Sequence, residues 1–132
     1  MNPRHIRLAL PLAVLAGVVG AALAGPAAGS APRASTKVCE IADDAYPGDG
    51  YFTGGYFTVR GVRCRTGKKL MIAYYKCRVS HGGKKGKCPT STKLLGTFRC
   101  KEKRTSIPTE INARVTCTRR GAEVVHTYQQ NT

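Results

Sequence analysis

The sequence predicts an α+β domain in which one helix packs on a small antiparallel sheet of three to five strands, held together by three disulfides. Three observations predict this fold: one stretch has helical spacing of its apolar residues, several stretches alternate apolar and polar residues, and a short chain contains six cysteines. Helical spacing and alternation each place apolar side chains on one face of an element. A single helix has to bury its apolar face against such a sheet.

The helix is predicted over residues 66–78, TGKKLMIAYYKCR. Thr66 is the expected N-cap, although Gly67 and the two lysines after it make a poor first turn. The apolar side chains at helical spacing are Leu70, Met71, Ala73, Tyr74 and Cys77.

Alternation predicts the strands, most clearly at residues 111–118, INARVTCT. A turn at residues 119–121 leads to a second strand at residues 123–128. The side chains expected on the inner face of these two strands are Ile111, Ala113, Val115, Cys117, Val124, His126 and Tyr128. Further strands are expected at residues 55–60 and 94–99, and an edge strand is expected at residues 37–42.

The cysteines lie at positions 39, 64, 77, 88, 100 and 117, and an even number in a short exported chain indicates three disulfides. Six cysteines allow fifteen pairings. The predicted elements favour the sequential one, because two cysteines lie on neighbouring strands and two flank a loop at the helix end: Cys39–Cys64, Cys77–Cys88 and Cys100–Cys117. The chain has no C-x-x-C pair and no paired histidines, so neither a metal site nor a cofactor is predicted.

Four short motifs carry a resemblance: V-R-C at 62–64, Y-K-C at 75–77, G-T-F-R-C at 96–100 and V-T-C-T-R-R-G at 115–121. Together they resemble a pattern found in small secreted, disulfide-paired proteins of high-GC Gram-positive bacteria. The resemblance covers residues 57–128 and implies export and a helix followed by paired Cys-bearing strands. It implies no activity. The chain departs from the pattern by adding Cys88 and the Lys-rich residues before it.

Residues 1–24 are predicted to be a cleaved signal peptide, because a basic start precedes an uncharged apolar run that ends in A-x-A at Ala24. A membrane anchor is the alternative, but Ala, Gly and Pro11 weaken the apolarity of the run. Residues 25–36 are an expected flexible leader, and residues 37–132 an expected single disulfide-stabilised domain. The protein is therefore predicted to be secreted, or associated with the cell wall, with no transmembrane segment after cleavage.

The charge is strongly positive, with 22 Lys and Arg against seven Asp and Glu. Between residue 60 and residue 132 there are 18 basic side chains and three acidic ones. Such a body attracts polyanions through a field that salt screens. The expected partners are an anionic cell-envelope polymer, a nucleic acid or an acidic protein. The residues expected to bind anions are Lys84, Lys85, Lys87, Lys101, Lys103 and Arg104.

The stretch SHGGKKGKCP, residues 80–89, raises the question of a phosphate-binding loop. It is not a Walker A motif, because His81 stands where the first glycine is required and Cys88 stands where the Ser or Thr is required. It also follows a predicted helix, whereas a Walker A loop precedes one. A basic loop closed by Cys77–Cys88 is predicted instead, either a solvated loop or a weak anion site.

Two further patterns are open to more than one interpretation. The tetrad GYFT occurs twice, at 50–53 and 55–58, and predicts either a strand with inward Phe residues or an exposed aromatic strip that stacks on ligands. His81, Glu110 and His126 supply the residue types of ribonuclease chemistry, which needs an acid and a base beside a cation. A secreted, non-enzymatic binding protein is the favoured function; a small secreted ribonuclease and an inhibitor of an extracellular hydrolase are the alternatives.

Overall fold

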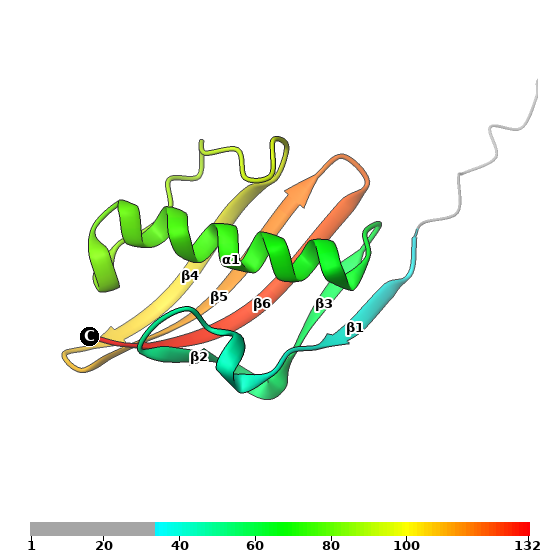
Figure 1. Cartoon of the computed structure of the whole chain (residues 1–132). Helices are drawn as coiled ribbons and strands as arrows, with labels where there is room; N and C mark the ends of the chain where they lie inside the picture. Colours follow the sequence, from blue (N-terminus) through cyan, green and yellow to red (C-terminus); the bar gives the residue numbers. More distant parts are fainter. Residues whose placement is uncertain (1–33) are drawn as a thin grey trace, which may run out of the picture. The chain divides into compact units, whose positions relative to one another are not determined.

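A computed structural model describes residues 34–132, and the signal peptide and most of the leader predicted above lie outside these residues. Three of the short elements are 3-10 helices, labelled η. In chain order the elements are β1 (Thr36–Glu40), η1 (Asp43–Ala45), β2 (Gly50–Phe52), η2 (Thr53–Gly55), β3 (Tyr56–Arg60), α1 (Cys64–Ser80), η3 (Gly83–Lys85), β4 (Arg99–Ile107), β5 (Glu110–Arg119) and β6 (Ala122–Asn131) (Figure 1).

The strands form one antiparallel sheet in the order β1-β3-β6-β5-β4, and β2 pairs with another part of β6. The α+β class is therefore confirmed, but the sheet has six strands rather than three to five. The difference arises at β6, which is ten residues long. Its edge is long enough for β2 to pair with residues 128–130 and for β3 to pair with residues 123–125.

The repeated GYFT tetrad explains how β2 and β3 share that edge. Phe52 and Phe57 are five positions apart, and in an unbroken strand an odd separation would put them on opposite faces. The turn η2 interrupts the alternation, with Gly54 and Gly55 at positive φ. Both Phe side chains are consequently buried. The tyrosine of each tetrad is exposed, Tyr51 in the first and Tyr56 in the second.

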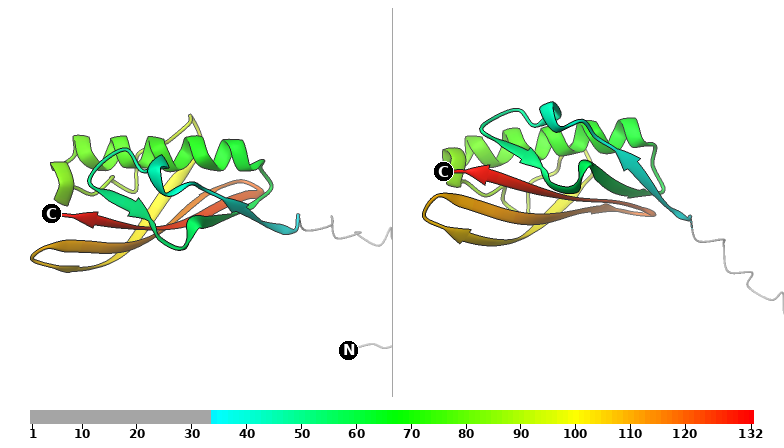
Figure 2. Two further views of the ribbon diagram at one scale, coloured as in Figure 1. Left: turned by 60° about the horizontal axis from the view of Figure 1, so that its bottom comes forward. Right: turned by 90° about the horizontal axis from the view of Figure 1, so that it is seen from below.

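Helix α1 covers one face of the sheet and the core lies between them (Figures 1 and 2). On β5 and β6 the buried side chains are those that alternation predicted, including Val115, Val124 and Tyr128. On α1, Leu70, Met71, Tyr74 and Cys77 are buried as expected. The predicted apolar face did not include Arg78, which the structure buries completely beside them.

The three disulfides follow the sequential pairing that the sequence analysis favoured. Cys39–Cys64 joins β1 to the first residue of α1. Cys77–Cys88 closes the loop after α1, and Cys100–Cys117 joins register partners on β4 and β5. Two disulfides thus attach the two ends of α1 to β1 and to the loop after the helix, and the third joins β4 to β5.

Several predicted boundaries are corrected. The helix begins at Cys64 rather than residue 66, and its N-cap is Arg63, which makes no side-chain capping bond. Thr66 therefore lies inside the helix. The strand predicted at residues 94–99 is mostly a turn: Leu94 forms an isolated bridge with Phe98, and β4 begins at Arg99. The edge strand ends at Glu40 rather than residue 42.

Gly67 is expected to be required by packing despite its low helix propensity. A Cβ at this position would lie 2.4 Å from Cε2 of Phe57 and 2.9 Å from Cγ1 of Val59. Alanine improves helix propensity by about 1 kcal/mol, but overpacking a tight core costs about 1–3 kcal/mol. We therefore expect Gly67→Ala to lower the free energy of unfolding in a urea titration. Thr66→Ala in the same turn is the control and should change it by less than about 0.5 kcal/mol; a more stable Gly67→Ala variant would contradict this packing argument.

Candidate anion-binding surface

The three candidate catalytic residues lie in different parts of the molecule. His126 is on β6 and faces α1, with 3% of its surface exposed. Glu110 lies on the opposite face of the sheet, where it accepts hydrogen bonds from Asn112 and Gln129. His81 is the C-cap of α1, and its Nδ1 contacts a backbone carbonyl of the last helical turn. The structure therefore does not bring these three residues to one site, as ribonuclease chemistry requires.

His126 is a neutral core residue. Its ring packs edge-on against Phe52 and Tyr74, with ring centroids 5.8 Å and 6.0 Å away. Burial lowers the pKa of His126 to about 3, and the nearby charge of Glu102 opposes this shift only in part. Its buried Nδ1 finds no hydrogen-bond partner among residues 34–132. An uncharged ring is the form that this aromatic environment tolerates.

Arg78 places a guanidinium in the core. Its Nη2 donates to the hydroxyl of Tyr46 at 2.8 Å and to Oε1 of Gln130 at 2.7 Å. The guanidinium carbon also lies 5.0 Å from the ring centroid of Tyr128 and 5.3 Å from that of Tyr75. Within residues 34–132 no carboxylate forms an ion pair with Arg78. Neutral oxygens and aromatic faces therefore stabilise this charge.

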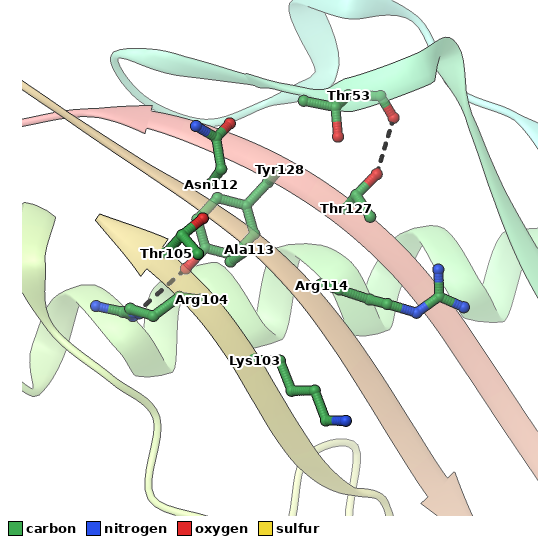
Figure 3. A pocket seen from close by; sticks show the side chains of 9 residues that line it. All are labelled: Thr53, Lys103, Arg104, Thr105, Asn112, Ala113, Arg114, Thr127 and Tyr128. Carbon is green, nitrogen blue, oxygen red and sulfur yellow. Dashed lines mark hydrogen bonds between the residues drawn. The ribbon is translucent and has the colours of Figure 1, made fainter. Parts of the chain in front are cut away.

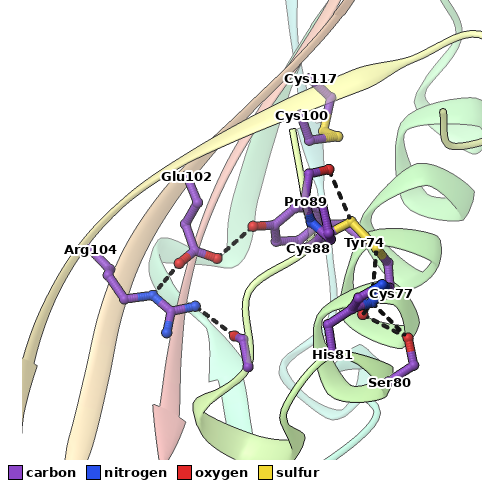
Figure 4. The surroundings of a disulfide bond; sticks show 11 residues. Tyr74, Cys77, Ser80, His81, Cys88, Pro89, Cys100, Glu102, Arg104 and Cys117 are labelled. Carbon is purple, nitrogen blue, oxygen red and sulfur yellow. Dashed lines mark hydrogen bonds and ion pairs between the residues drawn. A yellow bond between two sulfur atoms is a disulfide. The ribbon is translucent and has the colours of Figure 1, made fainter. Parts of the chain in front are cut away.

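Glu102 forms a second buried polar cluster, and Figure 4 shows its contacts with Tyr74 and Arg104. It accepts hydrogen bonds from the hydroxyls of Tyr74 at 2.5 Å and Tyr128 at 2.8 Å, and it pairs with Arg104. Burial pushes the pKa of Glu102 upward, but these three hydrogen bonds outweigh burial and hold it below its usual value. Burial, followed by the charge and hydrogen bond of Glu102, raises the pKa of both tyrosines. The carboxylate is thus ionised and the phenols neutral.

Arg78 and Arg104 also hold the backbone of the Lys-rich loop, residues 80–89. Nη1 of Arg78 donates to the carbonyl of Lys84 at 2.5 Å. Arg104 donates to the carbonyls of Lys85 at 3.0 Å and Gly86 at 2.8 Å. Three consecutive carbonyls therefore point inward, and the disulfide at Cys88 anchors the end of the loop (Figure 4). Internal hydrogen bonds therefore hold the backbone of the loop, while most of its residues are exposed to solvent.

Glycines in this loop serve close packing. A Cβ at Gly86 would lie 2.1 Å from the carbonyl oxygen of Arg78, so no other residue fits against the helix end. Gly82 and Gly83 have φ values of 131° and 61°, which favour glycine. The amide of Gly86 donates to the carbonyl of Gly83. The backbone here is thus committed to internal contacts.

The six residues expected to bind anions do not form one site. Lys84 pairs with Asp49 at 2.5 Å, and this hydrogen bond and charge lower the pKa of Asp49. Arg104 is committed to Glu102 and the loop carbonyls. Lys85 and Lys87 are exposed beside a depression of about 340 Å³. The remaining two, Lys101 and Lys103, lie on the face of the sheet turned away from α1.

That face carries a row of cations that we call the cationic sheet face: Arg99, Lys101, Lys103 and Arg114. No other element of residues 34–132 covers it (Figure 2). Lys103 and Arg114 are register partners on β4 and β5. Like charges directly opposite each other destabilise a sheet. Within residues 34–132, none of the ion pairs with carboxylates involves these four cations.

A depression of about 370 Å³ lies beside this pair (Figure 3). Its lining includes Thr53, Thr105, Asn112 and Thr127, although most of the surface exposed to it is apolar. The hydroxyl of Thr127 donates to the carbonyl of Thr53 at 3.1 Å, which fixes η2 as one wall. The depression is open and shallow between strands, so it suits a segment lying across the sheet better than an enclosed small molecule.

Exposed aromatic rings extend the cationic sheet face toward β3. A second depression of about 100 Å³ shares Arg114 and Thr127 with the first and adds Tyr56 and Thr58. Tyr56 is 56% exposed and Tyr51 is 42% exposed. Where a cation stands beside an exposed aromatic ring, the cation can contact the charge of a ligand and the ring can stack on its flat part.

The sequence analysis did not select Arg99 or Arg114 as anion-binding residues, although a signal for Arg114 was present. Once Cys100 is placed opposite Cys117, an antiparallel register places Lys103 opposite Arg114. The strand predicted before Cys100 ends at residue 99, so the prediction does not include the pairing of Lys103 with Arg114.

Lysines on an edge strand such as β4 also discourage edge-to-edge association of sheets. That explanation accounts for Lys101 and Lys103. It does not account for Arg114, because β5 lies between β4 and β6 in the interior of the sheet. Protection of a sheet edge therefore does not explain the placement of Arg114.

Residues 34–132 include no cluster of metal-ligating side chains and no helix long and apolar enough to cross a membrane. Comparisons of the chain with protein-family models, curated proteins and solved structures found no match. A function has to be argued from the residues of this surface.

Arg78→Leu is expected to lower the free energy of unfolding by roughly 3 kcal/mol, because it leaves buried oxygens without donors. It should also speed amide hydrogen exchange in residues 83–87, since the carbonyl of Lys84 loses its donor. Arg78→Lys keeps the charge but cannot reproduce the planar arrangement of donors of the guanidinium. It should therefore also lower the free energy of unfolding and speed exchange in the loop. Unchanged exchange in the loop would contradict the role of Arg78 as its anchor.

The free energy of unfolding is expected to fall as the pH drops from about 6.5 to about 4.5. The unfolded chain then protonates His126, whose ordinary pKa is 6.5, while the folded chain with its pKa of about 3 does not. The slope is at most about 1.4 kcal/mol per pH unit. His126→Phe should remove most of it in urea titrations, and His81→Ala, at an exposed position, should not. An unaltered slope in His126→Phe would assign the pH dependence to other groups.

Proposed function

We propose that this protein is an exported, non-enzymatic binding protein that engages a linear polyanion through its cationic sheet face. The observation that carries the proposal is the placement of Arg114 directly opposite Lys103 on an uncovered face, with no carboxylate of residues 34–132 paired to either. Like charges directly opposite each other weaken a sheet, so this pair costs stability unless something compensates for it. A bound anion supplies the compensation.

Export is supported by the cysteines and by the N-terminal sequence. All six cysteines are paired in disulfides, which persist in oxidising compartments. Residues 1–24 have the composition of a signal peptide. The anionic ligands available outside a cell include wall polymers, released nucleic acid and acidic proteins.

The spacing of the cations supports an extended ligand. Arg99, Lys101 and Lys103 alternate along β4, so they recur about every 6.6 Å. Arg114 stands on the next strand, about 4.8 Å away in the pairing direction. Tyr56 and the lining hydroxyls offer further contacts to the polymer backbone or its rings. A polymer with repeated phosphates or carboxylates can contact several of these cations together.

A second candidate function is inhibition of an extracellular hydrolase, and the geometry of the Lys-rich loop favours it. Arg78 and Arg104 hold three consecutive carbonyls, and the side chains of Lys85 and Lys87 are exposed. A loop fixed before binding loses little conformational entropy on docking. Co-purification with secreted proteases or lysozymes, combined with inhibition assays, tests this candidate; a Cys88→Ser/Cys77→Ser variant should then lose inhibition.

The polyanion proposal is tested by measuring affinity for heparin, single-stranded DNA and polyglutamate at several salt concentrations. Lys103→Ala/Arg114→Ala should weaken binding to the polyanions that the face recognises, and for single-stranded DNA it should reduce the slope of log K against log salt by about 0.7 per cation lost. The variant should fold at least as stably as the original chain, since it removes a repulsion.

The matched control is Arg63→Ala/Arg65→Ala, which removes the same charge from exposed positions at the start of α1. It should affect binding much less, because only the long-range field changes. Equal losses in the two variants would mean that net charge alone binds polyanions. Salt-insensitive binding, or none to any of the three polymers, would refute the proposal.

A further inference from the structure

We propose that a second surface, on α1 and independent of the cationic sheet face, binds an acidic polypeptide segment by accepting one of its apolar side chains. A groove of about 440 Å³ runs along the exposed side of the helix. We call it the helix groove, and it is lined by Lys68, Lys69, Ile72, Ala73, Lys76 and Leu95.

The lining separates into an apolar base and a basic rim. Lys68, Ile72 and Lys76 follow one another at four-residue spacing, so they lie along one line of the helix surface. Ile72 is half-buried between the two exposed lysines. Ala73, which the sequence analysis assigned to the core side, lines this groove as well. No carboxylate is among the lining residues, and α1 itself contains none.

Leu95 forms the wall of the groove from a strained turn. Its φ is 45°, and within residues 34–132 it is the one residue other than glycine with a positive φ. Gly96 follows with a φ of 78°, and the amide of Thr97 donates to the carbonyl of Leu94 at 3.2 Å. A tight turn with two positive φ values favours Asn-Gly. A leucine in the first position costs free energy.

Burial of the Leu95 side chain does not offset that cost, because 47% of the residue is exposed. Its neighbours Leu94 and Phe98 are buried and hold the turn in place. The strained residue is therefore the one that projects beside the helix. Backbone strain at an exposed apolar residue is expected where the side chain serves a ligand.

The shape and charge of the groove select the occupant. The groove is open, as is the depression beside Lys103 and Arg114, so its apolar base can cover one projecting side chain without enclosing it. The three lysines of the rim lack acidic partners in the groove and attract carboxylates on either side of that side chain. These two properties together match an acidic segment of a protein with one apolar anchor.

The test uses a synthetic peptide in which one leucine lies between two runs of glutamate, and a second peptide with alanine in place of the leucine. We expect the leucine peptide to shift the NMR signals of Ile72, Ala73 and Leu95, and to bind about tenfold more tightly than the alanine peptide. Leu95→Asn should lower affinity for the leucine peptide about tenfold while its Tm stays equal or rises, because asparagine suits the turn.

Lys76→Ala should weaken binding several-fold, and Arg63→Ala, which removes one exposed charge outside the groove, is its control. Equal affinities for the two peptides, or an unchanged affinity in Leu95→Asn, would overturn the proposal. Vesicles of phosphatidylglycerol provide a further arm. The proposal would be overturned in favour of a membrane surface if the protein bound these vesicles but not the leucine peptide, and if Leu95→Asn abolished the binding to vesicles.

Discussion

The buried guanidinium of Arg78 pairs with no carboxylate in the described part of the chain, and neutral oxygens and aromatic rings from several segments surround it. Tyr46 comes from the segment before β2, Gln130 from the end of β6, and the carbonyl of Lys84 from the Lys-rich loop. A charge in the core is costly unless each donor finds an acceptor. The positions of these three segments are therefore linked through one side chain.

Tyr128 connects this charge to the second buried cluster. Arg78 lies over its ring, and its hydroxyl donates to Glu102, which pairs with Arg104. The chain thus uses two of its arginines inside the fold, where they organise the loop by its carbonyls. Cations that internal contacts do not engage stand elsewhere, on the cationic sheet face and around the helix groove. The positive charge of the sequence is thus divided between cations with internal partners and cations that are exposed.

The two exposed surfaces differ in the way they could bind a partner. The cationic sheet face is flat, and its repulsive pair of Lys103 and Arg114 would gain from a repeated anion. The helix groove has an apolar base and a strained Leu95 on its wall, which would gain from burial of an apolar side chain. They lie on opposite sides of the sheet, so one molecule could hold a polymer on one side and a protein on the other.

Local patterns in the sequence were sufficient to predict the elements whose apolar residues are regularly spaced. The alternation of Ile111, Ala113, Val115 and Cys117, and the helical recurrence of Leu70 and Tyr74, record which face each element buries, and both were predicted. Together with the even number of cysteines, they led to the α+β class and the sequential disulfides. Two short elements broke the pattern: η2 resets the alternation of the repeated tetrad, and the turn at Leu95 occupies most of a predicted strand.

Only the tertiary structure decided which charges are free to bind. The sequence lists Arg78, Lys84, Arg104 and Arg114 as equivalent cations, since a basic residue has the same local pattern whether its partner is absent or distant in the chain. Arg78 meets Gln130 across 52 positions, and Lys84 meets Asp49 across 35. The sequence by itself determined the fold class, the faces of the main elements and the overall positive charge. Long-range contacts separated the buried cations from the exposed ones, because burial and ion pairing depend on segments that become neighbours only when the chain folds.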